Sequence, residues 1–406
     1  MRVLLSTIGS RGDVQPLVAL AWQLRELGQN VHLCVPPDFR EWIEGLGMSV
    51  TPIGPELRKL TAVRPVSATP TPFTPEQRRQ MMEGTIAAQF ETVAQAAKGC
   101  DAIVGATALQ FAAPSVAEKM GVPYVFAAFC PRVLPSARHH PIPYDVLGEK
   151  PAPDTADPRE LWAKDAQRSN DHSRELINAR RAAIGLPPID DVRGYVITRR
   201  PWLASDPVLA PWPDPADASV FQTGAWLLPD ESPLSAELER FLEAGEPPVY
   251  FGFGSIRATE GLADAMVRSA RAVGRRAIVS RGWAELSLVD AGSDSITIGD
   301  VNQQLLFARV AAVVHHGGAG TTTAAARAGA PQVVIPQMYD QHYYARRVQD
   351  LGIGTAHAPG TPTAESLTEA LARSLTSNVS IRARAIAGDV RADGARRAAE
   401  AVISLV

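Results

Sequence analysis

The sequence is poor in cysteine, carries little excess charge and contains no long apolar run, and each of these deficits excludes a class of protein. Its 406 residues include three cysteines, Cys34, Cys100 and Cys130, an odd number at wide spacings, each within or beside an apolar run. This pattern predicts reduced, packed thiols rather than a disulfide framework or a zinc site. A net charge of −3 gives no reason to expect nucleic acid or an anionic membrane as partner.

Targeting and membrane-spanning segments are also missing. No apolar run reaches the roughly 20 residues that a transmembrane helix needs. The apolar residues 3–5 are followed at once by the polar Ser6 and Thr7, which does not fit a secretory signal. We therefore expect a soluble cytoplasmic protein. The length and the 46% apolar content predict two domains of about 200 residues, each with its own core.

Strand and helix patterns alternate along the chain, which is typical of parallel sheets covered by helices on both faces. In the first half, strands are predicted at residues 3–5, 31–35, 50–53, 102–104 and 124–126, and helices at residues 17–27, 39–46 and 113–120. In the second half, strands are predicted at residues 249–253, 277–279, 296–298, 311–314 and 333–335, and helices at residues 261–273, 303–307, 343–351 and 364–375. We predict an α/β fold of two doubly wound, Rossmann-like domains facing a central cleft, with ligand sites at the carboxyl ends of the strands.

Proline-rich stretches set the predicted boundaries. Prolines are concentrated between residues 201 and 233. We therefore expect residues 1–205 to form one domain, 206–233 a linker and 234–389 a second domain. The amphipathic segment 390–406 can dock on either domain. Two further segments, 55–83 and 131–164, are rich in proline and charge, and they are either functional lids or tolerated surface insertions.

The most informative stretch is His-His-Gly-Gly-Ala-Gly-Thr-Thr-Thr at residues 315–323, between a predicted strand and a predicted helix. Backbone N–H groups and the helix dipole at such a turn attract an anion, and glycines let the backbone approach it closely. A diphosphate fits this site. The alternative is that the glycines only shape the turn and the threonines only cap the helix.

A second group of polar residues follows the first predicted strand. Gly9-Ser10-Arg11-Gly12-Asp13 lacks the Gly-x-Gly-x-x-Gly spacing of dinucleotide-binding loops. Asp13 is either the N-cap of the following helix or a general base, and the position alone leaves both roles open. Arg11 is either a solvated loop residue or a phosphate ligand.

Other turns of the second half supply groups suited to a base, a sugar and a phosphate. Ser255 offers a hydroxyl donor, and Trp283 either stacks on a planar base or packs in the core. Asp340 and Gln341 follow a predicted strand and could bond sugar hydroxyls.

Together, residues 9–13, 300–304, 315–323 and 338–341 resemble the inverting glycosyltransferases of the GT-B fold that use nucleotide-activated sugars. Within that superfamily the sequence is most similar to the actinomycete enzymes that glycosylate glycopeptide antibiotics of the vancomycin and teicoplanin type. The resemblance covers the whole chain. Many other GT-B enzymes carry a histidine base in the first loop, and this loop has none.

The resemblance implies a role for each matched residue. Asp13 matches the catalytic base, while Asp340 and Gln341 match the pair that reads the donor sugar. Val301 and Gln304 match positions beside the nucleobase and ribose, and Trp283 is the further candidate for the base. The positions that match diphosphate contacts are Arg11, Ser255, His315, Gly318, Gly320 and Thr321.

We therefore expect a monomeric enzyme that moves a hexose, of glucose or N-acetylglucosamine type, from a UDP- or dTDP-sugar to a hydroxyl of a glycopeptide aglycone, with inversion. The N-terminal half would bind the acceptor and the C-terminal half the donor. No Asp-x-Asp motif stands near the glycine turn, so no metal and no other cofactor is expected. Two alternatives stay open: a sugar-nucleotide 2-epimerase, and a non-catalytic sugar-nucleotide binding protein that supports a partner transferase.

Overall fold

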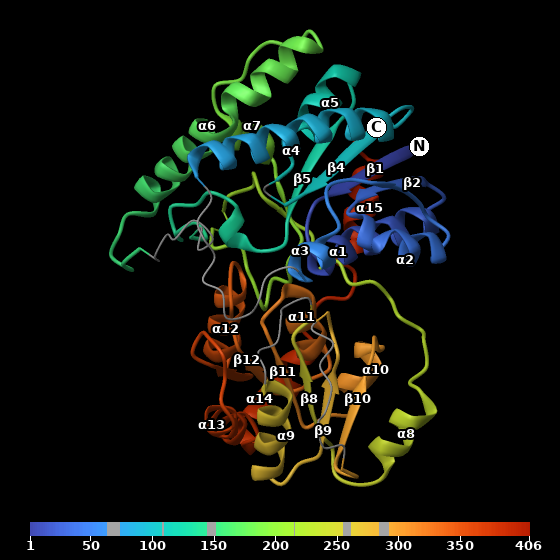
Figure 1. The fold of residues 1–406 in the computed structure, drawn as a ribbon, viewed down its shortest axis with the longest axis vertical. Helices are drawn as coiled ribbons and strands as arrows, with labels where there is room; N and C mark the ends of the chain where they lie inside the picture. Colours follow the sequence, from blue (N-terminus) through green and yellow to red (C-terminus); the bar gives the residue numbers. More distant parts are fainter. Residues whose placement is uncertain (63–73, 108, 144–151, 215, 255–260, 284–291) are drawn as a thin grey trace. The chain divides into compact units, whose positions relative to one another are not determined.

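Two parallel sheets, each covered by helices on both faces, organise this computed structural model, which describes residues 1–62, 74–107, 109–143, 152–214, 216–254, 261–283 and 292–406 (Figure 1). The chain divides into two units. The first unit comprises Met1–Ser205, Pro211–Leu228 and Ala392–Val406, and the second comprises Asp206–Ala210 and Pro229–Arg391. Each unit holds one sheet, which confirms the predicted α/β class with two doubly wound sheets.

In the described part of the first unit, the sheet has seven parallel strands in the order β3-β2-β1-β4-β5-β6-β7. They are β1 (Arg2–Thr7), β2 (Asn30–Val35), β3 (Ser49–Pro52), β4 (Ala102–Ala106), β5 (Tyr124–Ala128), β6 (Trp202–Leu203) and β7 (Phe221–Gln222). Leu4 and Ile103 pack on one face against α4 (Pro75–Ala96) and α5 (Ala113–Met120). Helix α1 (Arg11–Glu26) packs on β1, on β2 and on α15 (Gly394–Ile403).

The C-terminal helix α15 is fastened to the first unit by close backbone contacts. A Cβ atom on Gly394 would lie 2.4 Å from the carbonyl oxygen of Ala225, so only glycine fits there. Arg397 donates through Nη1 to the carbonyl of Thr223 at 2.9 Å. The last segment of the chain therefore returns to the unit that contains its first residue (Figure 1).

In the described part of the second unit, the sheet has six parallel strands in the order β10-β9-β8-β11-β12-β13. They are β8 (Val249–Gly252), β9 (Ala277–Ser280), β10 (Ser295–Ile298), β11 (Ala312–His315), β12 (Gln332–Val334) and β13 (Gly354–Ala356). Alternate residues face opposite cores, as the period of two requires. Val314 packs with α9 (Leu262–Ala272) and α13 (Ala364–Ser374), whereas Val313 packs with α8 (Ala236–Glu243), α10 (Gln303–Phe307) and α11 (Ala319–Arg327).

The remaining short elements complete the two units. They are η1 (Pro37–Phe39), α2 (Arg40–Gly45), α3 (Leu57–Ala62), η2 (Pro131–Val133), α6 (Pro158–Ala183), α7 (Val192–Ile197), α12 (Gln341–Asp350) and α14 (Ser377–Ala387).

Three proline-rich stretches contain more regular structure than the sequence predicts. Helix α4 begins at Pro75 behind the capping residue Thr74, and α6 begins at Pro158 behind the capping residue Asp157. Proline is favoured at the first helical position, where its missing N–H would be unpaired anyway, so in both places it starts a helix. The expected lid segment 55–83 thus contains α3 and the start of α4, while its residues 63–73 lie outside the described ranges. The expected linker contributes strand β7 to the first sheet.

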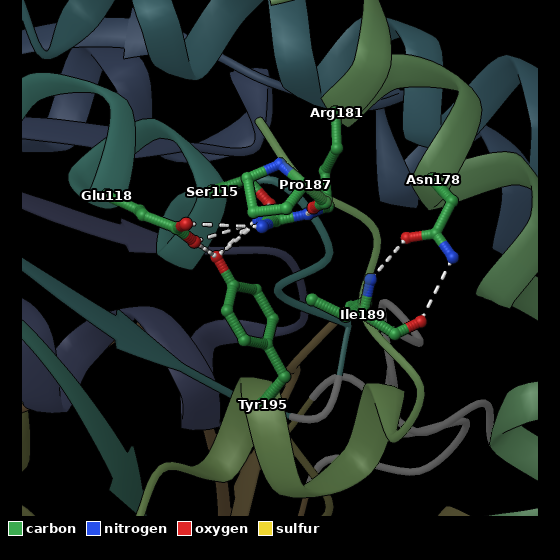
Figure 2. A network of polar contacts seen from close by, with 7 residues as sticks. All are labelled: Ser115, Glu118, Asn178, Arg181, Pro187, Ile189 and Tyr195. Carbon is green, nitrogen blue, oxygen red and sulfur yellow. Dashed lines mark hydrogen bonds and ion pairs between the residues drawn. The ribbon is translucent and has the colours of Figure 1, made fainter. Parts of the chain in front are cut away.

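A buried arginine joins three helices of the first unit (Figure 2). Arg181 of α6 is 1% exposed, and its two Nη atoms lie 2.9 and 3.2 Å from the carboxylate oxygens of Glu118 on α5. Tyr195 of α7 donates to Glu118 at 2.6 Å, and Arg181 also donates through Nε to the carbonyl of Pro187 at 2.8 Å. Because these bonds join side chains of α5, α6 and α7, the network holds the three helices in one arrangement.

The described residues include no helix that is long and apolar enough to cross a membrane.

Candidate functional site

The glycine turn joins β11 to α11 in a conformation that requires glycine. Gly317 has a φ of +96°, and a Cβ atom there would lie 2.7 Å from Cγ1 of Val334 and 3.0 Å from the carbonyl oxygen of Gln341. The first hydrogen bond within the helix runs from the N–H of Thr322 to the carbonyl of Gly318 at 3.0 Å. The N–H groups that precede it, on residues 319–321, therefore point out of the helix end, where they favour an anion.

The threonines of this turn have different roles. Thr322 and Thr323 donate their hydroxyls to the carbonyls of Gly318 and Ala319, at 2.9 and 2.7 Å. Because these hydroxyls donate to carbonyls of the helix itself, they are not donors to a bound anion. Thr321 stays half-buried in the first turn, beside the exposed Gly320.

His315 does not present its imidazole to a ligand, which corrects the prediction of a direct diphosphate contact. The side chain is fully buried, its Nε2 lies 2.8 Å from Oε1 of Gln332, and its Nδ1 accepts from the N–H of Gly317 at 3.1 Å. Burial lowers the pKa of His315 to about 3, so the ring is neutral. The buried ring supports the conformation of the turn through its bond from the Gly317 N–H.

His316 is the residue of the pair that lies at the surface of the turn. A Cβ atom on Gly318 would lie 2.7 Å from its Nε2, and one on Gly254 would lie 3.2 Å from its Cε1, so the ring sits between two glycines. Its Nδ1 is buried and makes no hydrogen bond within the part of the chain that the structure describes. Burial lowers the pKa of His316 to about 4. His316 belongs to the predicted 315–323 stretch, but no individual role was predicted for it.

The loop after β12 approaches the glycine turn, because the Gln341 backbone lies beside Gly317. Gln341 is buried, and its Oε1 accepts the N–H groups of Gln337 at 2.8 Å and Met338 at 3.1 Å. This amide oxygen therefore holds the loop, and the predicted contact between Gln341 and the donor sugar stays a prediction. Asp340 is half-buried at the N-cap of α12 and follows Tyr339, whose φ of +52° is unusual for a residue other than glycine.

The residues predicted to hold the nucleobase and ribose follow neighbouring strands. Trp283, after β9, is half-buried and donates its backbone N–H to the carbonyl of Gly254 at 2.9 Å. Val301, after β10, packs partly against the core of the second unit, while Gln304 on α10 is exposed. Asn302 between them caps α10 by accepting the N–H of Leu305 at 3.1 Å. Ser255 lies outside the described residues.

Within the second unit these groups share one edge of the sheet. They follow the carboxyl ends of β8, β9, β10, β11 and β12, and parallel strands end at the same edge. The arrangement offers backbone N–H donors, an imidazole, an indole and a carboxylate to one extended ligand.

Asp13 lies in the first unit, at the third position of α1 rather than at the N-cap. Ser10 is the N-cap, and the two residues form a capping box in which Oδ2 of Asp13 accepts the N–H of Ser10 at 2.7 Å. A Cβ atom on Gly9 would lie 2.2 Å from the same oxygen. Burial raises the pKa of Asp13 to about 6, more than the bonds from Ser10 lower it. A carboxylate with that pKa is suited to accept a proton near neutral pH.

Arg11 is the first residue of the same helix. Its Nε donates to Oε1 of Gln15 at 3.2 Å, and its guanidinium lies 4.8 Å from the centre of the Trp42 ring. These contacts orient the side chain at the start of the helix.

Among the residues that the structure describes, no three His, Cys, Asp or Glu side chains gather in a way that could hold a metal ion.

Comparison with known proteins adds independent information. Residues 3–137 match the glycosyltransferase family 28 N-terminal domain, and residues 265–403 match the erythromycin biosynthesis protein CIII-like C-terminal domain. The chain is 50% identical to glycosyltransferase GtfE and 49% identical to vancomycin aglycone glucosyltransferase, both of Amycolatopsis orientalis, over 100% of this chain and 98% of each relative. It is 42% identical to dTDP-epi-vancosaminyltransferase of the same organism, over 95% of this chain and 93% of the relative.

Solved structures show the same fold at lower identity. The glycotransferase of kitacinnamycin superposes with a TM-score of 0.73 at 18% identity, covering 100% of this chain and 98% of the other. Glycosyltransferase VinC, solved in complex with dTDP, superposes with a TM-score of 0.66 at 20% identity, covering 100% and 99%.

Proposed function

Because the chain belongs to the family of GT-B glycosyltransferases that includes vancomycin aglycone glucosyltransferase, we propose that it moves a hexose from a UDP- or dTDP-sugar to a hydroxyl of a glycopeptide aglycone. Two relatives support the acceptor and donor classes by their names, one acting on vancomycin aglycone and one using a dTDP-sugar. We favour glucose or N-acetylglucosamine as the sugar. The enzyme would work in the cytoplasm as a monomer and without a metal ion.

The observation that carries the donor site is the open helix end at the glycine turn. The N–H groups of residues 319–321 precede the first intrahelical bond, and His316 adds a buried ring nitrogen without a partner among the described residues. A diphosphate leaving group gains negative charge as the sugar is transferred, and fixed N–H donors stabilise that charge without reorganising. Asp340, on the adjacent loop, is the group that we assign to the donor sugar.

The acceptor proton would go to Asp13. In a single displacement, the acceptor oxygen bonds to the anomeric carbon while the bond from that carbon to the diphosphate breaks, which inverts the configuration. The carboxylate of Asp13 accepts the hydroxyl proton in the same step. Its raised pKa of about 6 makes it a stronger base than an ordinary carboxylate. Its bond from the Ser10 N–H fixes its orientation.

A proline substitution tests the glycine turn by deleting one backbone donor. Ala319 is the first residue of α11, and the preceding Gly318 has φ −62° and ψ 141°, angles that suit a residue before proline. Ala319→Pro should therefore keep the helix while removing one N–H from the anion site. We expect about a tenfold weaker affinity for UDP or dTDP in calorimetry, the effect of one charge-assisted hydrogen bond.

The matched control is Ala236→Pro, at the first position of α8, whose capping residue Ser235 has φ −64° and ψ 149°. This variant should leave the affinity for both nucleotides unchanged. An unchanged affinity in Ala319→Pro as well would remove the glycine turn from the donor site.

A further inference from the structure

A buried glutamine on a neighbouring strand is bonded to the glycine turn from below. Gln332 of β12 and His315 of β11 are both fully buried, and the register pairs His315 with Val334, two residues beyond Gln332. Residues two apart lie on one face of a strand, so both side chains project from the same face of the sheet. Oε1 of Gln332 lies 2.8 Å from Nε2 of His315, and Nε2 of Gln332 donates to the carbonyl of Thr322 at 3.3 Å.

The directions of these hydrogen bonds follow from one another. The N–H of Gly317 donates to Nδ1 of His315 at 3.1 Å, so Nδ1 carries no proton. A neutral imidazole then carries its proton on Nε2 and donates it to Oε1 of Gln332. That leaves the amide nitrogen of Gln332 to donate to Thr322, in the first turn of α11. One side chain thus connects to both ends of the glycine turn.

We propose that Gln332 is a positioning residue for the donor diphosphate. Its amide oxygen keeps His315 in the Nε2–H tautomer. In that tautomer Nδ1 of His315 accepts the Gly317 N–H, which keeps this N–H directed inward. The amide nitrogen of Gln332 fixes the first turn of α11 through the carbonyl of Thr322. The N–H groups of residues 319–321 are then aimed out of the helix end before any ligand arrives. This inference rests on the proposed function, because it assigns a purpose to the same anion site.

Preorganised donors bind more tightly because less conformational freedom is lost on binding. Losing the Gln332 side chain should therefore weaken the contact to the phosphates and leave the contact to the base and ribose unchanged. This difference separates positioning of the turn from a general loosening of the second unit, which would weaken both.

The test variant is Gln332→Met, which keeps the volume of the side chain and removes both hydrogen bonds. The control is Ser374→Ala, because the hydroxyl oxygen of Ser374 lies 3.1 Å from the backbone carbonyl oxygen of Gln332 and 2.8 Å from the hydroxyl oxygen of Thr355, so this variant changes a buried neighbour and leaves the side-chain bonds of Gln332 in place. Affinities are measured for UDP against uridine and for dTDP against thymidine. We expect Gln332→Met to bind the diphosphates about tenfold more weakly and the nucleosides unchanged, and Ser374→Ala to bind all four as wild type does. Equal losses for diphosphate and nucleoside, or no loss for either, would overturn the inference.

A double substitution tests whether the two buried side chains act as one unit. If they do, His315→Leu combined with Gln332→Met should cost about the same tenfold as either change alone. A loss of about a hundredfold, the product of two independent effects, would contradict the proposed chain of bonds.

Nitrogen NMR of the histidine-labelled full chain tests the tautomer directly and needs no nucleotide. Wild type should show His315 with its proton on Nε2, and Gln332→Met should change both that signature and the amide shift of Gly317. A proton on Nδ1 in wild type, or unchanged spectra in the variant, would overturn the inference even if the variant proved too unstable for binding studies. A wild type that binds neither UDP nor dTDP would instead overturn the proposed function, while the spectra would still decide whether Gln332 sets the turn.

Discussion

Gly9→Ala is expected to disable catalysis by displacing the base. The added Cβ atom would lie 2.2 Å from Oδ2 and 2.5 Å from the carboxyl carbon of Asp13, where real Cβ contacts stay beyond 3.0 Å. The carboxylate must therefore move by on the order of 1 Å and lose its 2.7 Å bond from the Ser10 N–H. A displacement of that size is worth about a hundredfold in turnover.

The assay is turnover at saturating donor and acceptor, with the affinity for UDP or dTDP measured alongside. The control is Gly12→Ala in the same turn, where an added Cβ atom has only the hydroxyl oxygen of Ser10, at 3.6 Å, within 4 Å. We expect nucleotide affinity to stay normal in both variants, because residues 9 and 12 belong to the first unit. Turnover of Gly9→Ala within about threefold of wild type, or an equal loss in Gly12→Ala, would refute the role of Asp13.

Because only the carboxylate form of Asp13 accepts a proton, turnover should rise with pH through about 6 and level off above it. Asp13→Asn should remove this rise with pH and lower turnover by roughly 100- to 10,000-fold. A rate within about threefold of wild type would leave Asp13 with a capping role only. Arg181→Met should lower the free energy of unfolding, measured by urea titration, by about 3 kcal/mol. This value is at the lower end for a broken buried ion pair, because the Glu118 side chain is 38% exposed. Arg79→Met, which breaks an exposed pair with Glu175, is its control and should cost less than about 1 kcal/mol; equal effects would contradict the burial argument. Asp340→Ala should lower turnover while UDP or dTDP binds normally, and a parallel loss of nucleotide affinity would show that the loop has misfolded instead.

The elements that the sequence predicts well are those whose signal is local. Buried parallel strands read as short apolar runs, and the residues that end them meet at one edge of the sheet, so the positions of Trp283, Val301 and Asp340 follow from pattern alone. The starts of α4 and α6 also have local signals, Thr74-Pro75 and Asp157-Pro158, but these lie in proline-rich stretches whose composition favours irregular chain.

The roles within the histidine pair needed the structure. Adjacent residues at a strand end point to opposite sides, and only the packing of β12 shows that His315 is the one turned into the core. Gln332 belongs to no motif, and its role depends on the register between two strands. Asp13 is intermediate. Ser10-x-x-Asp13 fits a capping box with Ser10 at the N-cap, although the position alone leaves Asp13 open between an N-cap and a general base. Its raised pKa follows from burial that no local pattern shows.

The most direct test of the proposed activity is incubation of the full chain with a labelled UDP- or dTDP-hexose, with and without a vancomycin-type aglycone. Transfer predicts labelled glycopeptide of inverted anomeric configuration and one nucleoside diphosphate released per sugar, only when the aglycone is present. Conversion of the nucleotide sugar without any acceptor would indicate an epimerase. Binding without conversion, across both donor classes and a panel of glycopeptide aglycones, would contradict the account and leave a sugar-nucleotide binding protein.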